Sequence, residues 1–288
     1  MTRKRKKYRS LEILREVLAN RTAKIGLVIV IVFLITAVFA PLLAPYNPYE
    51  QDFSIGLKRP SFEHPLGTDE YGRDVLSRIL YGSRQTLIIL LATSLLGLVT
   101  GGGLGMITGF YGGTLDMVFM RLLDVLLAFP SIILALAIIS ATGPGLHGVI
   151  IAITVSSIPQ FGRVARGAVL SAKENDYVMA AKATGERTAS IIFRYILPNT
   201  IMPIIALGAL QVATIIIVAA SLSFLGVGIQ PPAADWGVML NQGRMYARLA
   251  PYLSIFPGLA IMFVVLGFNL LGDGLRDALD PKTKKYSE

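Results

Sequence analysis

The stretch IGLVIVIVFLITAVFAPLL, residues 25–43, decides what kind of protein this chain forms. Its nineteen residues include no charge, and the charge-free run continues to residue 49. A helix needs about 20 mostly apolar residues to cross the hydrocarbon core of a bilayer. We therefore expect residues 25–43 to form a membrane-spanning helix.

Long charge-free runs recur along the chain, at residues 85–115, 125–162, 195–234 and 249–272. The run at 125–162 is too long for one helix, and Gly143-Pro144-Gly145 interrupts it near its middle. Helices satisfy all their backbone polar groups within the bilayer. The pattern therefore predicts six spans, the first followed by Thr86–Phe110, Leu122–Ala141, Leu146–Phe161, Thr200–Ser221 and Tyr252–Leu271.

Composition supports a membrane protein and excludes several kinds of site. Of 288 residues, 53% are hydrophobic and 16% charged, and the mean hydropathy is +0.62. Because the chain has no cysteine, disulfides and thiolate metal sites are excluded. The two histidines, His64 and His147, are far apart, which argues against a histidine metal site. The sequence holds no Walker motif or catalytic signature, so we expect neither a cofactor nor catalysis.

The distribution of basic residues predicts the orientation. The 27 Lys and Arg against 18 Asp and Glu give a net charge of +9. Twenty of the basic residues flank the spans on the side of the two termini, and seven lie on the other side. The positive-inside rule places both termini in the cytoplasm, and it explains the basic charge better than nucleic-acid binding does. A cleaved signal peptide would have a shorter apolar core, so we expect the first span to remain as a signal anchor.

Several positions within the spans invite specific interpretations. Arg121 and Asp124 lie on one helix face and predict a local ion pair, with a proton relay as the alternative. Pro130 predicts a kink. Glycines at every fourth position predict a groove for close helix packing, a better fit than a dinucleotide fingerprint because no strand precedes them. These glycines are Gly97, Gly101, Gly105, Gly109 and Gly113.

Polar and aromatic residues elsewhere leave alternatives open. Gln211 is the most polar residue in the middle of the fifth span, where it either forms an interhelical hydrogen bond or lines a translocation path. Trp236 is interpreted as an interfacial anchor. The stretch Glu50–Arg84 is nearly neutral in charge, so we expect it to be well solvated, with an amphipathic surface helix at Asp74–Ser83. No charge lies deep in a span, which argues against an ion-coupled secondary carrier.

The segment 163–198 between the fourth and fifth spans is not loop-like in composition. Ser171–Thr184 predicts a helix, Gly185 interrupts it, and Glu186–Ile196 predicts a second helix that Pro198 stops. A turn at Gly185 would suit a positive φ. Such a hairpin is either a docking element for a partner or a structural brace, and the residues alone do not decide between the two.

Part of this segment resembles a known motif. YVMAAKATGERTASIIFRYILPN, residues 177–199, is similar to the "EAA" loop of ABC-importer permeases. The matching positions are Ala180, Ala181, Gly185, Leu197 and Pro198. Met179 departs from the motif, which usually has Glu at this position.

Three further stretches extend the resemblance to most of the chain. They resemble the C-type subunit of the dipeptide/oligopeptide/nickel permease family. They are LGTDEYGRDVLSRILYGSR (Leu66–Arg84), GIQPPAADWGVML (Gly228–Leu240) and FNLLGDGLRDALDP (Phe268–Pro281).

The resemblance implies an all-α integral membrane protein with six transmembrane helices and the type I ABC importer transmembrane-domain fold. It implies a homologous permease subunit as the other half of the pore, two cytoplasmic ATPase subunits and an extracytoplasmic solute-binding protein. The short helix around Ala180–Arg187 would be the coupling helix, with Ala180 and Ala181 facing the ATPase closely. The implied docking residues are Ala180, Ala181, Gly185, Glu186, Arg187, Leu197 and Pro198; Gln211 is the candidate for lining the pore.

The expected organisation has five parts. They are a basic cytoplasmic segment (1–24), the first span (25–44), an extracytoplasmic loop (45–85), a five-helix permease core (86–271) that includes the loop 163–198, and a cytoplasmic tail (272–288). The substrate stays open: di- and oligopeptides lead, with nickel chelates or glutathione-like peptides as alternatives. A secondary carrier or channel is the alternative class.

Overall fold

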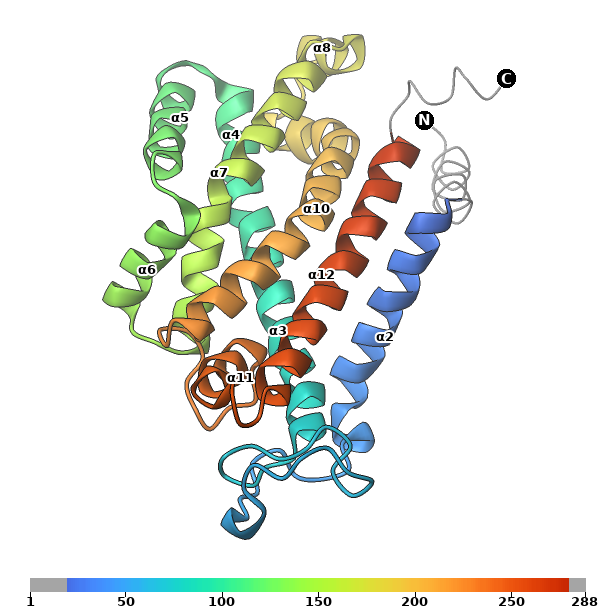
Figure 1. Ribbon diagram of the computed structural model, residues 1–288. Helices are drawn as coiled ribbons and strands as arrows, with labels where there is room; N and C mark the ends of the chain where they lie inside the picture. Colours follow the sequence, from blue (N-terminus) through green and yellow to red (C-terminus); the bar gives the residue numbers. More distant parts are fainter. Residues whose placement is uncertain (1–19, 280–288) are drawn as a thin grey trace. The chain divides into compact units, whose positions relative to one another are not determined.

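Most of the described chain is helical, as Figure 1 shows. The computed structural model describes residues 20–279, and side chains for residues 20–276. The head before Asn20 and the tail after Leu279 lie outside the described residues, so the expectations for the two termini stay predictions there. The α-helices are α2 (Arg21–Leu43), α3 (Val75–Gly97), α4 (Gly103–Tyr111), α5 (Gly113–Leu127), α6 (Ser131–Thr142), α7 (Leu146–Lys173), α8 (Asp176–Ala183), α9 (Thr188–Ser190), α10 (Leu197–Phe224), α11 (Trp236–Gly243) and α12 (Tyr252–Leu279).

The membrane spans agree with the charge-free runs. Five stretches are long and apolar enough to cross a bilayer, and the bent pair α5–α6 brings the number to six when it is taken as one span. Two of these stretches, Val75–Tyr111 and Thr188–Phe224, are longer than the spans expected there. The reason is that α3 joins α4, and α9 joins α10, through π-helical turns at Leu98–Gly102 and Ile191–Ile196. The amphipathic helix expected at Asp74–Ser83 is therefore wrong as a separate element: Val75 onward is the start of α3.

The third expected span, Leu122–Ala141, is not one helix. Helix α5 ends at Leu127, α6 begins at Ser131, and the two are bent by 97°. Pro130 causes the break because it offers no N–H to a preceding carbonyl and disfavours a helical conformation at Phe129. The kink expected at Pro130 is confirmed, and it is large enough to separate two helices.

Two compact units divide the chain. One combines the residues up to Ile89 with those from Val212 onward, and the other is Leu90–Gln211. In the first unit, α2 packs along α12, and Figure 1 shows the two side by side. Small residues allow this approach: a Cβ at Gly26 would lie 2.6 Å from the backbone nitrogen of Leu271. Phe33 of α2 adds an edge contact to Phe268, with ring centroids 6.0 Å apart.

Trp236 is not an interfacial anchor. Its side chain is buried in the first unit, with 3% of the residue exposed. The indole N–H donates to the carbonyl of Ile79 at 3.0 Å, and the ring lies against Gly82, where a Cβ would come within 2.6 Å of it. The indole is buried because the neighbouring Gly82 makes room for it and the carbonyl of Ile79 accepts its N–H.

In the second unit the glycine groove is confirmed for four of its five members. A Cβ at Gly97 or Gly101 would overlap Phe161 or the carbonyl of Ile158, at 2.9 and 2.7 Å. Further along α7, a Cβ at Gly105 would overlap the carbonyl of Gly162, and a Cβ at Gly109 would make a tight contact of 3.2 Å with Arg166. Gly113 has nothing within 4 Å and does not belong to the groove.

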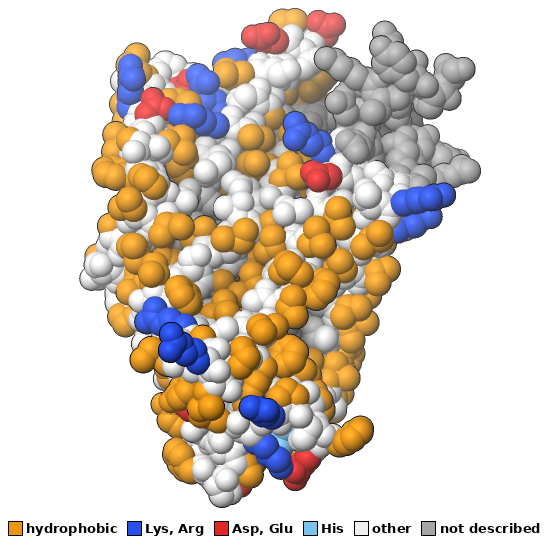
Figure 2. All heavy atoms as spheres, viewed as in Figure 1, with side chains coloured by type: hydrophobic (Ala, Val, Ile, Leu, Met, Phe, Trp, Pro, Cys, Tyr) orange, Lys and Arg blue, Asp and Glu red, His pale blue; other side chains and the backbone are white. Residues whose placement is uncertain are grey.

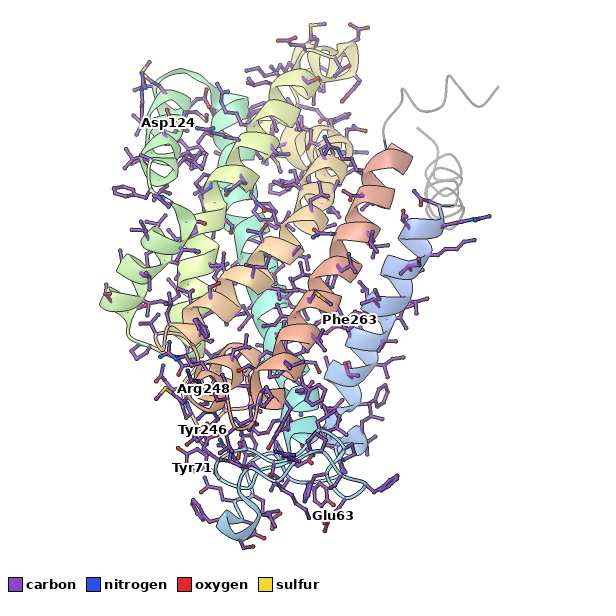
Figure 3. All side chains as sticks on the ribbon, in the orientation of Figure 1. Glu63, Tyr71, Asp124, Tyr246, Arg248 and Phe263 are labelled. Carbon is purple, nitrogen blue, oxygen red and sulfur yellow. The ribbon has the colours of Figure 1, made fainter. Side chains whose placement is uncertain are left out.

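Ion pairs join α5 to α7. The guanidinium of Arg166 donates to both carboxylate oxygens of Asp116, at 2.6 and 2.7 Å. Asp124, labelled in Figure 3, accepts from Arg163 at 2.7 Å. The expected pair between Arg121 and Asp124 is present at 3.9 Å, but Arg163 is the closer partner. Ion pairs between residues 39 and 50 positions apart in the chain thus hold α5 and α7 together near both ends of α5.

Candidate functional site

The candidate docking site is the hairpin between α7 and α10. The expected single helix Ser171–Thr184 is interrupted where α7 ends at Lys173 and α8 begins at Asp176. Asn175 explains the break: its backbone is extended, at φ −75° and ψ 145°, and its side-chain amide donates to the carbonyls of Ser171 and Ala172. These bonds satisfy carbonyls that the end of a helix leaves without a partner.

Gly185 ends α8 through a Schellman motif. Its φ is +75°, as expected from the sequence, and its N–H donates to the carbonyl of Lys182. The next N–H, of Glu186, donates to the carbonyl of Ala181 at 3.1 Å. This pair of bonds is the standard way to close a helix on a left-handed residue, and glycine adopts that conformation without a steric cost.

Glu186 organises the second leg of the hairpin. Its carboxylate accepts from the hydroxyl of Ser190 at 3.0 Å and from that of Tyr195 at 3.2 Å. The expectation that the second helix stops at Pro198 is wrong. The helix expected at Glu186–Ile196 continues through Pro198 into α10. The π-helical turn directly before Leu197 already departs from the regular hydrogen-bond pattern, so the missing N–H of Pro198 does not end the helix.

One face of the hairpin is buried within the second unit. Val178 and Ala181 of α8 pack with residues of α4, α7 and the π-helical turn. Ala181 is 6% exposed, so the expectation that it faces a partner closely is wrong: its methyl group belongs to the protein's own core. The cluster consists of Met106, Val169, Ala172, Val178, Ala181, Ile191, Ile192 and Ile196, with Phe110, Tyr195 and Leu197 partly buried against it.

The other face of the hairpin is open and mixed in character. Ala180, Gly185 and Arg187 are exposed, and Glu186 and Pro198 are half-buried. Large apolar side chains lie on the same hairpin, with exposures of 39% for Tyr177, 51% for Met179 and 68% for Phe193. The hairpin is therefore packed into the core on one face and presents both apolar and charged side chains on the other, which suits it to docking. Gln211, in α10, is half-buried and lies outside the hairpin.

A second feature, missed by the sequence analysis, is a buried charged cluster in the first unit: His64, Asp69, Arg73, Asp74 and Arg78. The expectation that Glu50–Arg84 is well solvated is wrong for these residues, each of which is at most 5% exposed. Asp69 accepts from Arg73 Nε at 2.7 Å, and His64 Nδ1 lies 3.0 Å from Asp74. The sequence feature that could have revealed the cluster is the density of opposite charges in the motif Leu66–Arg84. Composition alone suggests that such a charged stretch is solvated.

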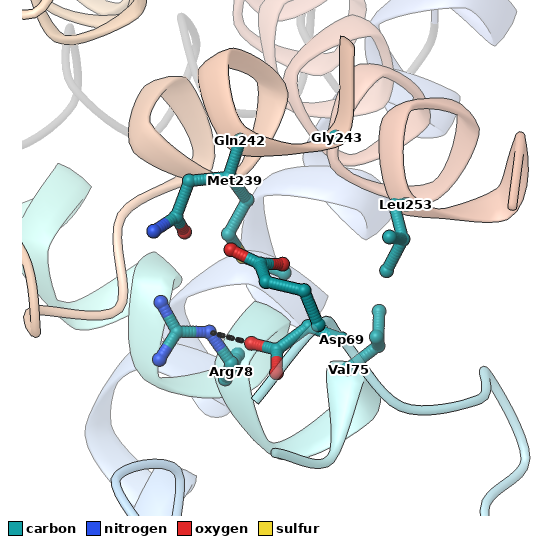
Figure 4. A pocket seen from close by; sticks show the side chains of 8 residues that line it. Asp69, Val75, Arg78, Met239, Gln242, Gly243 and Leu253 are labelled. Atoms are coloured by element: carbon teal, nitrogen blue, oxygen red, sulfur yellow. Dashed lines mark ion pairs between the residues drawn. The ribbon is translucent and has the colours of Figure 1, made fainter. Parts of the chain in front are cut away.

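Arg78 connects three segments of this unit. Its guanidinium donates to the carbonyls of Pro48, Pro232 and Ala233, at 3.0 to 3.4 Å. Its Nε lies 3.5 Å from Asp69, the ion pair drawn in Figure 4. Arg78 and Asp69 border a small pocket, shown in Figure 4. Its lining residues are Asp69, Glu70, Val75, Arg78, Met239, Gln242, Gly243 and Leu253.

Two carboxyl groups near this cluster have raised pKa values. Burial raises the pKa of Glu70, and burial also raises the pKa of Asp235, which caps α11 by accepting from the N–H of Val238 at 3.0 Å. Loss of water around a carboxylate favours the neutral form, which is the physical cause in both cases. No group of three or more metal-ligating side chains occurs in the part of the chain that the structure describes.

The apolar helices and the bent span define a polytopic membrane protein, and comparison with known proteins gives its family. Residues 101–285 match the model of the binding-protein-dependent transport system inner membrane component, and the chain belongs to this family. Residues 11–60 match the N-terminal TM domain of oligopeptide transport permease C. The chain is thus a permease subunit of an ABC importer, as the sequence motifs implied.

Similar proteins agree with this assignment. The dipeptide transport system permease protein DppC of Alkalihalophilus pseudofirmus is 46% identical over 95% of this chain and 90% of its own length. The glutathione transport system permease protein GsiD of Pectobacterium atrosepticum is 43% identical over 95% and 91%. A chain of the MetNI methionine ABC transporter, solved in inward facing conformations, matches with a TM-score of 0.56 at 18% identity, covering 70% of this chain and 97% of that one. The fold is that of type I ABC importer membrane domains, as expected.

Proposed function

We propose that this permease subunit imports short peptides, in particular dipeptides. The observation that carries the proposal is the 46% identity with a dipeptide transport permease over nearly the whole chain. The 43% identity with a glutathione transport permease makes glutathione, itself a short peptide, the second candidate. Nickel chelates have no comparable support among these relatives.

The subunit works within a larger assembly. A homologous permease supplies the other half of the pore, two ATPase subunits bind the nucleotide, and a solute-binding protein delivers the peptide. Both termini lie in the cytoplasm, which the excess of basic residues on that side supports. This places the hairpin in the cytoplasm, where an ATPase subunit can reach it.

The hairpin couples ATP use to the pore. When ATP draws the two ATPase subunits together, the hairpin moves with the subunit that holds it. Because Val178 and Ala181 are packed into a core with residues of α4 and α7, the hairpin cannot move without moving those helices. ATP binding then favours one of two arrangements of the pore. The subunit itself contributes positions and surfaces rather than chemistry.

Uptake by cells tests the substrate class. Cells that lack their own dipeptide permease would express this chain with its partner subunits, and uptake of a labelled dipeptide would be measured with unlabelled competitors. We expect dipeptides to compete best and glutathione less well. Preferential competition by glutathione would reassign the substrate to the second candidate, and competition by a nickel chelate alone would contradict a peptide importer.

Two variants of the hairpin test the docking role. Ala180→Arg adds bulk on the exposed face, and Gly185→Asp strains a left-handed residue by about 1–2 kcal/mol without a steric clash, since nothing lies within 4 Å of its Cβ position. We expect both variants to insert in the membrane but to lose co-purifying ATPase and substrate-stimulated ATP hydrolysis.

The matched control is Gln51→Arg, which adds the same side chain at an exposed position of the segment 45–74. It should retain the ATPase subunits. Normal ATPase recovery and stimulation in Ala180→Arg and Gly185→Asp would mean that the hairpin is a structural brace. Ala181→Glu is a poorer test, because it would place a charge in the core.

A further inference from the structure

The segment between α11 and α12, residues 244–250, has two distinct sides. It starts as a 3-10 turn at Arg244–Tyr246 and stays helical at Ala247, with φ −56° and ψ −28°. The N–H of Ala250 donates to the carbonyl of Tyr246 at 2.7 Å, as in a helix. Residues four positions apart therefore lie on the same side of the segment. One side carries Arg244 and Arg248, and the neighbouring side carries Met245 and Leu249.

The segment lies at the level where two membrane spans of the first unit end. The guanidinium of Arg244 is 5.4 Å from the ring centroid of Phe224, the last residue of α10. The side chain of Asn241 also donates to the carbonyl of Phe224. On the other side, α12 begins at Tyr252, two residues after the segment ends. The boundary of the hydrocarbon core therefore falls close to residues 244–250.

Both sides of the segment are exposed. Met245 is 77% exposed and Leu249 is 65% exposed, although both are large apolar residues. Arg244 and Arg248 are exposed too, and neither forms an ion pair with any carboxylate among the side chains described, residues 20–276. Figure 3 labels Tyr246 and Arg248 in this segment. Two guanidinium groups without anions next to two bare apolar side chains call for a ligand with both an anion and an apolar part.

We propose that residues 244–249 bind the head groups of anionic phospholipids. The guanidinium groups pair with the lipid phosphate, for which arginine offers two parallel N–H donors. Met245 and Leu249 enter the boundary between head groups and acyl chains, as the apolar side of an interfacial helix does. A free phosphate ion would use the arginines alone, whereas a phospholipid also contacts Met245 and Leu249 at the end of two spans. The proposal depends on this loop and not on the transported substrate.

The test compares lipid retention by the intact transporter. Native mass spectrometry of the detergent-purified complex would count phosphatidylglycerol and phosphatidylcholine molecules that remain bound at defined lipid concentrations. Each arginine near an anionic surface contributes about fivefold in affinity, so Arg244→Gln with Arg248→Gln should weaken phosphatidylglycerol binding by about thirtyfold. The double lysine variant, Arg244→Lys with Arg248→Lys, should keep most of the binding because it keeps both charges.

Matched variants separate this site from general charge effects. Lys58→Gln with Arg59→Gln removes the same charge from another part of the unit and should leave phosphatidylglycerol retention unchanged. Met245→Ser with Leu249→Ser should weaken the binding of phosphatidylglycerol and of phosphatidylcholine equally, because it removes apolar contact and not charge. If the double glutamine variant does not fold, the two single glutamine variants carry the same comparison at about fivefold each.

Three results would overturn the proposal. One is equal phosphatidylglycerol retention by the native complex and the glutamine variants. Another is an equal response to inorganic phosphate and to phosphatidylglycerol, which would indicate an ion site. The third is a double glutamine variant that retains as much lipid as the native complex but no longer associates with the solute-binding protein. That result would assign the surface to that protein.

Discussion

At the scale of single residues, close approach of backbones sets the packing of the second unit. The residue Gly105 lies against the backbone of Gly162 in α7, whereas Gly103, two positions earlier on the same helix, has no atom within 4 Å of its Cβ position. The two glycines share a helix and differ in their surroundings. Adding one methyl group at each position therefore separates the effect of packing from the effect of helix propensity.

We predict opposite effects of alanine at these two positions. Gly105→Ala places a Cβ against a backbone carbonyl that cannot move away, which should lower stability by about 1–3 kcal/mol. Gly103→Ala meets nothing and should raise stability by up to about 1 kcal/mol, since alanine is the better helix former. The midpoint of thermal unfolding in detergent, measured for both variants, gives the sign. Equal shifts in the two variants would contradict the groove.

At the scale of elements, Arg78 holds the segment 45–74 against its own unit. The side chain comes from the first turn of α3, and it contacts the carbonyls of Pro48 on one side and of Pro232 and Ala233 on the other. Asp69 adds an ion pair from a further part of the segment. A long stretch whose regular structure is limited to a 3-10 turn at Phe53–Ile55 is tied to its unit here because one buried cation satisfies several acceptors at once.

We predict that Arg78→Met loosens this segment. The variant leaves carbonyls without a donor and removes one partner of a buried ion pair, which costs about 3–5 kcal/mol. Trypsin should then cut faster after Lys58, which lies in the segment.

The matched control is Arg84→Met, which replaces an exposed arginine of the same helix. Its rate of cleavage should stay at the native level, because substitutions at exposed positions usually change stability by less than about 0.5 kcal/mol. Faster cleavage in both variants would indicate a general effect of lost charge.

At the scale of the whole molecule, charge and apolar length determine how the chain crosses the bilayer. The five candidate spans become six crossings when the bent pair α5–α6 is taken as one span. Six crossings predict that both termini lie on the same side, and the distribution of Lys and Arg predicts that this side is the cytoplasm.

We predict this topology for single-cysteine variants, which need no background substitutions because the chain has no cysteine. Asp52→Cys and Ala247→Cys should react with a membrane-impermeant maleimide in intact cells. Asn175→Cys and Lys284→Cys should react only after permeabilisation. Labelling of Asn175→Cys in intact cells, with all four variants reactive in opened cells, would contradict the six-span topology.

Much of the candidate hairpin was predictable, because its signals are local. Gly185 has the positive φ that its place between two helical patterns predicted. Outside the hairpin, the kink at Pro130 is equally local, because it follows from the missing N–H of one residue. Less predictable were the ends of the second helix. Pro198 reads as a stop in one dimension, but a π-helical turn directly before it lets the helix continue. The burial of Ala181 was not predictable either. A run of alanines does not show which face of a helix is buried until the neighbouring elements are known.

The sequence by itself determined the class of protein, the positions of the spans and the close packing along the glycine stripe, since apolar length, charge and residue size act locally. Only the tertiary structure decided which groups are buried outside those runs. Trp236 found Ile79 and the space at Gly82, and Arg78 found carbonyls more than 150 residues away. Burial of a polar group depends on partners that satisfy it, and partners distant in the sequence become neighbours only when the chain has folded.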